Sequence, residues 1–97
     1  MKNNIITEYY SNRQIMCQEW RKNDKVHRND DKPALVCYYS NGRVMYQEWY
    51  KNGKVHRDGD KPAFIWYYKN GQIECQERYK NGVQEGLQEY WEQINEE

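Results

Sequence analysis

The sequence lacks any long apolar run, and only 37% of its 97 residues are hydrophobic. No stretch approaches the roughly 18 apolar residues that a membrane-spanning helix needs. The first ten residues, MKNNIITEYY, lack the charged and hydrophobic regions of a signal peptide. We therefore expect a cytoplasmic protein with no membrane partner.

The chain also lacks an excess of charge of either sign. Lys plus Arg and Asp plus Glu both number 15, so the formal net charge is zero. No global field attracts nucleic acid or an anionic membrane, although local patches remain open. Lysines beside the His-Arg pairs could form a basic ridge, but aspartates interleave with them. Nucleic-acid and lipid-headgroup binding are therefore disfavoured.

Cysteine and glycine motifs that carry chemistry are absent. There are three Cys and no C-x-x-C motif, so all three cannot pair within one chain. We predict reduced, partly buried thiols, with Cys17 and Cys75 at one repeat position and Cys37 outside that register. The two histidines lie 29 residues apart, which is no recognised metal-ligand spacing. No Gly-rich phosphate loop is present, and we expect no metal and no cofactor.

Aromatic residues are abundant, with ten Tyr and four Trp. Tyr and Trp bury a large ring while their polar atom reaches water, which suits a thin sheet. Tyr9, Tyr38 and Tyr67 each open a Tyr-Tyr pair, at a constant step of 29 residues. The chain is therefore a repeat array, with units at about 5–33, 34–62 and 63–97 in one domain spanning 1–97.

Each unit contains a β-hairpin pattern. The middle unit has ALVCYYS, Asn41-Gly42 and RVMYQEWY, followed by Asn52-Gly53. Asn-Gly between two β-rich segments predicts a type I′ turn, because both residues tolerate positive φ. We predict an all-β fold: a single elongated antiparallel β-meander of about seven to nine strands, built from three hairpin repeats, in which each strand pairs with its sequence neighbour.

The end of the chain departs from the repeat. Matching Tyr90-Trp91 to Tyr67-Tyr68 makes the segment 87–91 a closing strand. Leu87, Tyr90, Trp91 and Ile94 are also spaced i, i+3, i+4 and i+7, which is typical of a short amphipathic helix. Both structures stay open, and the strand is the favoured one.

Strand alternation predicts two faces. One carries Ile15, Cys17, Val44, Tyr46, Tyr50, Ile73, Cys75 and Tyr79, and we expect it to be the core. The other carries Met16 and Trp20 in unit one, and Met45 and Trp49 in unit two. Either the connectors cover these four residues, or they form an exposed stripe that binds a partner.

The two connectors, VHRNDDKPA (26–34) and VHRDGDKPA (55–63), repeat a His-Arg pair. A catalytic site would be unique, whereas this set recurs at the repeat period. We therefore expect Arg28 and Arg57 to pair with Asp31, Asp60 or strand Glu residues and to tie each loop to the sheet.

The strings YYSNGRVMYQEWYKNG and YYKNGQIECQERYKNGVQEGLQEYW resemble the MORN-repeat variant family over nearly the whole chain. The connectors look like those of repeats in large DNA viruses and some bacteria. The resemblance implies an antiparallel meander without catalytic residues. It also implies interaction repeats, or antitoxin and immunity components that neutralise a toxin by binding it.

We therefore expect a non-catalytic protein-binding module that inhibits or sequesters a partner protein, which is an enzyme or a toxin. An antitoxin or immunity protein and a viral or phage inhibitor of a host protein both fit this description. The predicted contact residues are Met16, Trp20, Met45, Trp49, Arg28 and Arg57. The alternative is a structural repeat protein that self-assembles into a homo-oligomer through its edge strands.

Overall fold

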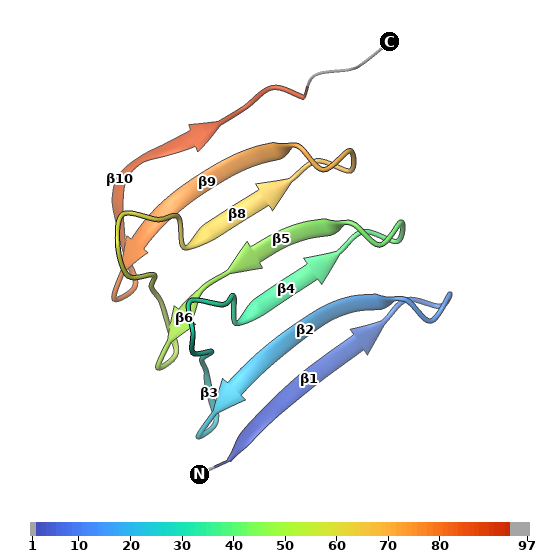
Figure 1. The fold of residues 1–97 in the computed structure, drawn as a ribbon, viewed down its shortest axis with the longest axis horizontal. Coiled ribbons are helices and arrows are strands. Elements are labelled where there is room, and N and C mark those ends of the chain that lie inside the picture. Colours follow the sequence, from blue (N-terminus) through green and yellow to red (C-terminus); the bar gives the residue numbers. More distant parts are fainter. Residues whose placement is uncertain (1, 94–97) are drawn as a thin grey trace.

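The computed structural model describes residues 2–93 as an antiparallel β structure (Figure 1). Ten strands follow one another along these residues. They are β1 (Asn3–Tyr9), β2 (Ile15–Lys22), β3 (Lys25–Val26), β4 (Leu35–Tyr38), β5 (Val44–Glu48), β6 (Tyr50–Lys51), β7 (Lys54–Val55), β8 (Phe64–Tyr67), β9 (Ile73–Lys80) and β10 (Val83–Tyr90). None of the described residues lies in a helix.

The sheet order is β1-β2-β4-β5-β8-β9-β10, with β3 paired to β2 and β6 paired to β7 in a separate ladder. This confirms the all-β meander, and residues 83–90 form a strand where a helix was the alternative. Ile94, which completes the helical spacing, lies outside the described residues. The prediction that every strand pairs with its sequence neighbour was wrong, because β5 pairs with β8 and the intervening strands β6 and β7 form their own small ladder.

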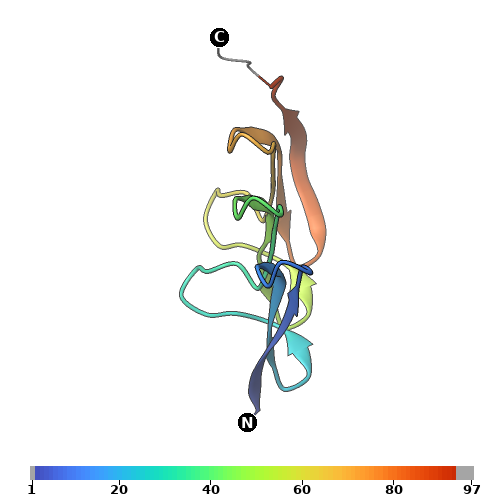
Figure 2. The ribbon, with the colours of Figure 1, turned by 90° about the vertical axis from the view of Figure 1, so that its right-hand side faces the viewer.

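The molecule is a thin slab whose principal extents are 51 × 38 × 17 Å. Figure 2 shows the sheet edge-on, with both connectors on the same side. We call that side the connector face and the opposite side the reverse face. A slab of this thickness has no second layer to bury a sheet face, so the connectors provide the cover.

The two Asn-Gly turns of unit two differ in conformation. Asn52 and Gly53 both have positive φ (52° and 82°), as a type I′ turn requires. In the Asn41-Gly42 turn only Gly42 has positive φ (88°). The Gly42 N–H donates to the Tyr39 carbonyl at 2.9 Å. That turn is a three-residue loop ending in a left-handed glycine, so the type I′ prediction was right for the second turn and wrong for the first.

A β-bulge follows each three-residue loop and shifts the alternation. Tyr38 pairs with Val44, but Cys37 pairs with Tyr46, which leaves Met45 without a Cα partner. Directly paired residues share a face, so Val44 and Tyr46 lie on opposite faces. The same shift occurs at Met16 and at Glu74. The predicted common face for Val44 and Tyr46, and for their equivalents, was therefore wrong.

The core lies under the connectors. Trp49, Ala63 and Ile65 form a buried cluster, against which Val55, Tyr67, Ile73 and Tyr79 pack. Ile73 and Tyr79 pack against it as predicted, whereas Trp49 was assigned to the other face. The connector backbone covers the ring of Trp49, and this cover is what the sheet alone cannot supply.

Two of the cysteines form a disulfide, Cys17–Cys37, and Cys75 is free and buried. The prediction of three reduced thiols was therefore wrong for Cys17 and Cys37. Cys37 lies outside the repeat register, yet β2 pairs with β4 so that Cys17 and Cys37 are directly opposite. Cross-strand neighbours of this kind are close enough to bridge.

Candidate partner-binding site

The histidines of the connectors hold each connector to the next unit. His27 Nδ1 accepts a hydrogen bond from the Asn52 N–H at 3.0 Å, and His56 Nδ1 accepts one from the Asn81 N–H at 3.0 Å. The Nε2 of His27 lies 2.7 Å from Asn29 Oδ1, and that of His56 lies 2.7 Å from Asp58 Oδ1. Nδ1 must be unprotonated to accept. Both histidines therefore serve the architecture of the array.

The arginines stack on the tryptophans of the connector face. The guanidinium carbon of Arg28 lies 3.7 Å from the ring centroid of Trp20, and that of Arg57 lies 3.9 Å from the ring of Trp49. Each arginine also donates through Nη1 to a proline carbonyl, Arg28 to Pro33 and Arg57 to Pro62. The connectors thus fold back over the tryptophans.

In unit two, Asp31 of the preceding connector closes this arrangement. Its carboxylate pairs with Arg57 Nε at 2.8 Å and with Lys61 Nζ at 3.0 Å. Its carbonyl accepts from Trp49 Nε1 at 3.1 Å. We call this set, Asp31 with Trp49, Arg57 and Lys61, the Asp31 clamp. It confirms the predicted pairing of Arg57 with an aspartate.

The Asp31 clamp removes unit two from the predicted exposed stripe. Trp49 is only 7% exposed and belongs to the core, so of the two alternatives the connector cover holds for this residue and the exposed stripe does not. Met16 and Met45 are half-buried at the bulges and do not line the pocket beside Trp20. The six predicted contact residues are therefore not one surface.

Unit one presents the same groups without an aspartate in the place that Asp31 occupies. Trp20, Arg28 and Lys32 lie 29 residues before Trp49, Arg57 and Lys61, and they line an open pocket of about 480 Å³. We call it the unit-one pocket. Its charged lining is Arg21, Lys22, Arg28, Lys32 and Asp30.

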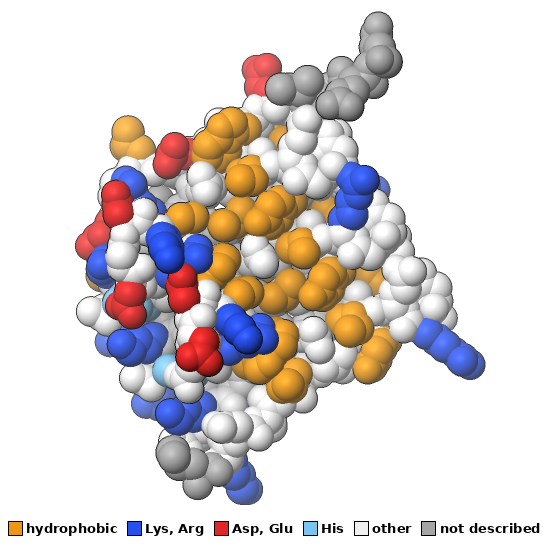
Figure 3. All heavy atoms as spheres, in the orientation of Figure 1, with side chains coloured by type: hydrophobic (Ala, Val, Ile, Leu, Met, Phe, Trp, Pro, Cys, Tyr) orange, Lys and Arg blue, Asp and Glu red, His pale blue; other side chains and the backbone are white. Residues whose placement is uncertain are grey.

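The pocket is open because of the path of β1. By the repeat, Lys2 is the counterpart of Asp31. Residues 3–5 pair with β2 instead of crossing Trp20, and the Lys2 carbonyl accepts from the Asn23 N–H at 2.9 Å. Figure 3 shows the connector face, with charged side chains gathered over the connectors and an apolar area beside them.

The reverse face carries a second aromatic group. The ring centroids of Tyr46 and Trp66 are 4.5 Å apart, and those of Phe64 and Trp66 are 5.7 Å apart. All three side chains are half-buried. In the next row of paired residues, Glu48 lies between Leu35 and Phe64. Strand alternation in the sequence does not reveal this group, because the bulge reverses the alternation.

The two edge strands expose the large apolar side chains. In the described part of the chain these are Ile5, Ile6, Tyr9, Val83, Leu87, Tyr90 and Trp91, with exposures from 40% to 85%. All of them lie in β1, in β10 or directly after β10. The interior strands have neighbours on both sides, so exposed apolar surface remains at the two ends of the array.

Among residues 2–93, no cluster of three His, Cys, Asp or Glu side chains could hold a metal ion. No described helix is long and apolar enough to cross a membrane. The perturbed pKa values belong to residues with structural partners, such as Asp31, Glu48 and Tyr50.

Comparison with known proteins returned no match: no family model fits the chain, and neither a curated protein nor a solved structure is similar to it. The resemblance to MORN-repeat variants therefore stays a prediction made on the quoted motifs.

Proposed function

We propose that this protein is a non-catalytic binding module that inhibits or sequesters a partner protein, and that the unit-one pocket with Trp20 and Arg28 is its contact site. The observation that carries the proposal is the contrast between the two units. Trp49 and Arg57 are closed by Asp31, whereas Trp20 and Arg28 have the same arrangement and no such cover. Trp and Arg are the residues most enriched at binding hot spots.

The shape of the molecule supports a protein as the ligand. A slab 17 Å thick offers area without a deep cleft, and small substrates favour enclosed pockets. An antitoxin or immunity role, or a viral or phage inhibitor role, is the form of this function that the motif resemblance supports. An enzyme is the partner that such a role implies.

Cytoplasmic localisation is part of this proposal, and the disulfide counts against it. Disulfides persist in oxidising compartments and are rare in the cytosol, yet Cys17 and Cys37 are bridged. The redox state of Cys17 and Cys37 in cells therefore tests the localisation directly.

Capture from an extract of the native host tests the proposal. The wild-type chain and Trp20→Ala are immobilised, and co-purifying proteins are identified by mass spectrometry. Trp91→Ala is the matched control, because Trp91 is 40% exposed at the far end of the array. We expect Trp20→Ala to lose the partner and Trp91→Ala to keep it. Equal capture by the three proteins, each folded by circular dichroism, overturns the proposal.

Edge-to-edge assembly is the second candidate, favoured by the apolar side chains on β1 and β10. An edge strand offers unpaired N–H and C=O groups to another chain. Light scattering over a concentration series tests it, with Leu87→Lys as the variant because Leu87 is 85% exposed. Assembly predicts oligomers that Leu87→Lys dissolves, whereas a monomer at every concentration contradicts it.

Nucleic-acid and lipid-headgroup binding remain the least favoured functions. The connector cations Arg57 and Lys61 are neutralised by Asp31, so the basic ridge that either function needs is interrupted. Phosphate binding would weaken steeply with salt, and binding that persists between about 50 and 200 mM salt argues against it.

A further inference from the structure

We propose that the unit-one pocket binds an aspartate in an exposed loop of the partner protein, in the way that Asp31 occupies the equivalent place in unit two. This inference rests on the proposed function and specifies the chemistry of the partner. The chain contains this site twice. In unit two its own Asp31 fills the site, and in unit one the site is open.

The Asp31 clamp shows what the site recognises. One residue supplies two acceptors: its carboxylate, to Arg57 Nε and Nη2 at 2.8 and 3.3 Å and to Lys61 Nζ at 3.0 Å, and its carbonyl, to Trp49 Nε1 at 3.1 Å. A carboxylate on an arginine fork is a directional, charge-assisted contact. The carbonyl contact fixes the backbone of the same residue against the indole.

The donors of unit one are placed alike and are not used. Among the described residues, Trp20 Nε1 and Lys32 Nζ have no acceptor, and Arg28 donates only through Nη1, to the Pro33 carbonyl at 3.1 Å. The guanidinium is already held against the Trp20 ring at 3.7 Å. Because the Arg28 guanidinium is ordered before binding, little conformational entropy is lost when it engages a carboxylate.

The charge of the pocket favours an acidic ligand. Its lining holds four cationic side chains and one carboxylate, that of Asp30. Arg21 is paired with Glu19 at 2.8 Å, which leaves Lys22, Arg28 and Lys32 in excess over Asp30. His27 faces the pocket as well, and its Nδ1 is engaged by the Asn52 N–H.

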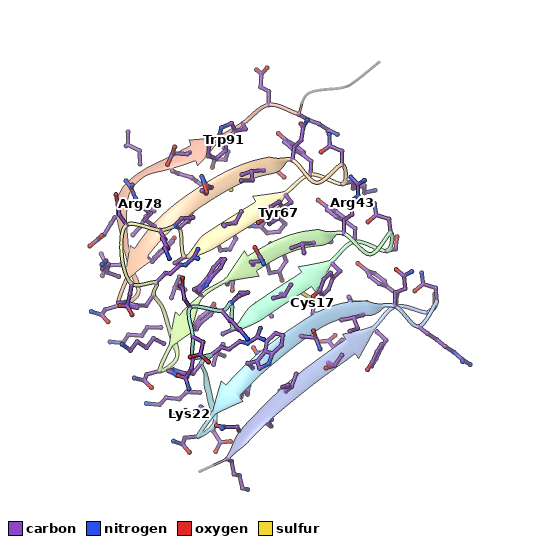
Figure 4. All side chains as sticks on the ribbon, in the orientation of Figure 1. Cys17, Lys22, Arg43, Tyr67, Arg78 and Trp91 are labelled. Atoms are coloured by element: carbon purple, nitrogen blue, oxygen red, sulfur yellow. A yellow bond between two sulfur atoms is a disulfide. The ribbon has the colours of Figure 1, made fainter. Side chains whose placement is uncertain are left out.

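A second copy of this chain is a poorer occupant than a different protein. The chain has two aspartates at the relevant repeat position, Asp31 and Asp60. Asp31 is held by Arg57 and Lys61, and Asp60 is paired with Arg78 at 3.3 Å. Figure 4 labels Arg78 at the connector end of the sheet. A second copy would have to break its own pairs in order to bind.

A peptide copied from the connector tests this chemistry. The probe is acetyl-NDDKPA-amide, which has the sequence of residues 29–34, and its control carries Asn in place of the second Asp. The full-length chain is titrated with each peptide while the indole N–H signal of Trp20 is followed by NMR. We expect a saturable shift with the Asp peptide, and about fivefold weaker binding of the Asn peptide, because one exposed ion pair is lost.

Two variants assign the shift to the pocket. Arg28→Gln removes the fork and should abolish the difference between the peptides. Arg43→Gln, which changes the same residue type at the opposite end of the sheet (Figure 4), should preserve it. No shift of Trp20, or equal affinity for the two peptides, overturns the inference.

The outcomes separate this inference from the proposed function. If Trp20→Ala loses the captured partner but the two peptides bind equally, the proposed contact site is supported and the proposal that it binds an aspartate is wrong. If the Asp peptide binds selectively but Trp20→Ala captures its partner normally, the proposed function fails at this site. A Trp20 shift that depends on the concentration of the chain alone, without peptide, identifies a second copy and overturns the choice of partner.

Discussion

Glu48 is a carboxylate placed in an aromatic environment. It lies on the reverse face between Leu35 and Phe64, and Tyr50 donates to it at 2.9 Å. Burial raises the pKa of Glu48, and the Tyr50 hydrogen bond opposes that effect. Burial and the same carboxylate also raise the pKa of Tyr50. The ionised form of Glu48 therefore carries a desolvation cost at neutral pH.

Glu48→Gln should stabilise the protein at pH 7, because the neutral amide avoids the desolvation cost of the ionised carboxylate and still accepts from Tyr50. A group with a raised folded-state pKa destabilises the fold once the pH exceeds that value. Urea unfolding at pH 7 measures the change. Glu19→Gln is the control, because Glu19 is paired with Arg21 and should gain nothing. A loss of stability in Glu48→Gln contradicts the argument.

Asp31 shows the opposite effect of surroundings. Hydrogen bonds from Arg57 and then Lys61 lower the pKa of this carboxyl to about 2. Its folded-state pKa is below its unfolded value of about 3.9, so the stabilisation is present above pH about 4 and is lost as the pH falls through about 2.

Asp31→Asn should therefore destabilise the fold at pH 6 by about 0.2–1 kcal/mol, the range for exposed ion pairs. The difference from the wild type should shrink below pH about 4 and disappear only below pH about 2, where the carboxyl is protonated in the folded protein as well. Urea midpoints across this pH series test it. A difference that is independent of pH would show that the Asp31 clamp does not act through charge.

At the scale of the elements, tyrosine hydroxyls connect neighbouring units. The second tyrosine of each doublet donates to a carbonyl of the next unit: Tyr10 to Tyr38 at 2.5 Å, Tyr39 to Tyr67 at 2.6 Å, and Tyr68 to Trp91 at 2.6 Å. Trp91 thus takes the place of Tyr67 in the ladder. The predicted match of Tyr90 to Tyr67 was wrong by one residue, since Tyr90 pairs with Cys75 as Trp66 does.

Tyr39→Phe should lower the free energy of unfolding by about 1 kcal/mol, the net value of one such hydrogen bond. Tyr68→Phe is its matched control, because its bond lies at the exposed end of the array, where water can replace the hydroxyl. Thermal unfolding of both variants measures the difference. An equal cost for both would mean that the ladder does not depend on shielding from water.

At the scale of the whole molecule, one covalent bond joins the first two units. The Cys17–Cys37 bridge connects β2 to β4, whereas the equivalent row between β5 and β8 holds Tyr46 and Trp66. A disulfide therefore joins units one and two, whereas aromatic rings pack between units two and three.

Reduction should lower the free energy of unfolding by about 3 kcal/mol, as expected for a loop of this size, 20 residues in sequence. Alkylation followed by mass spectrometry reports the bridge. The native chain should stay unmodified because Cys75 is buried, the unfolded chain should take one label, and the reduced unfolded chain should take three. Three labels on the unfolded chain without reductant would contradict the bridge.

The sequence by itself determined the array. The 29-residue step, the Asn-Gly corners and the strand patterns predicted an all-β meander, and residues at equal positions do make equal contacts, as His27 and His56 show. These features are local or periodic, so they can be read along the chain. The connection of Arg57 to Asp31 was also predictable, because opposite charges recur in the connectors.

Only the tertiary structure decided the faces, the bridge and the site. One unpaired residue at Met45 inverts the alternation, and no period in the sequence marks it. Cys17 and Cys37 are neighbours only through the pairing of β2 with β4. Trp20 and Trp49 both follow Gln-Glu and both carry an arginine of their own connector, but the preceding connector also covers Trp49, whereas Trp20 borders a pocket. That difference arises because burial depends on which segment lies above a residue, and the order of residues along the chain does not contain this information.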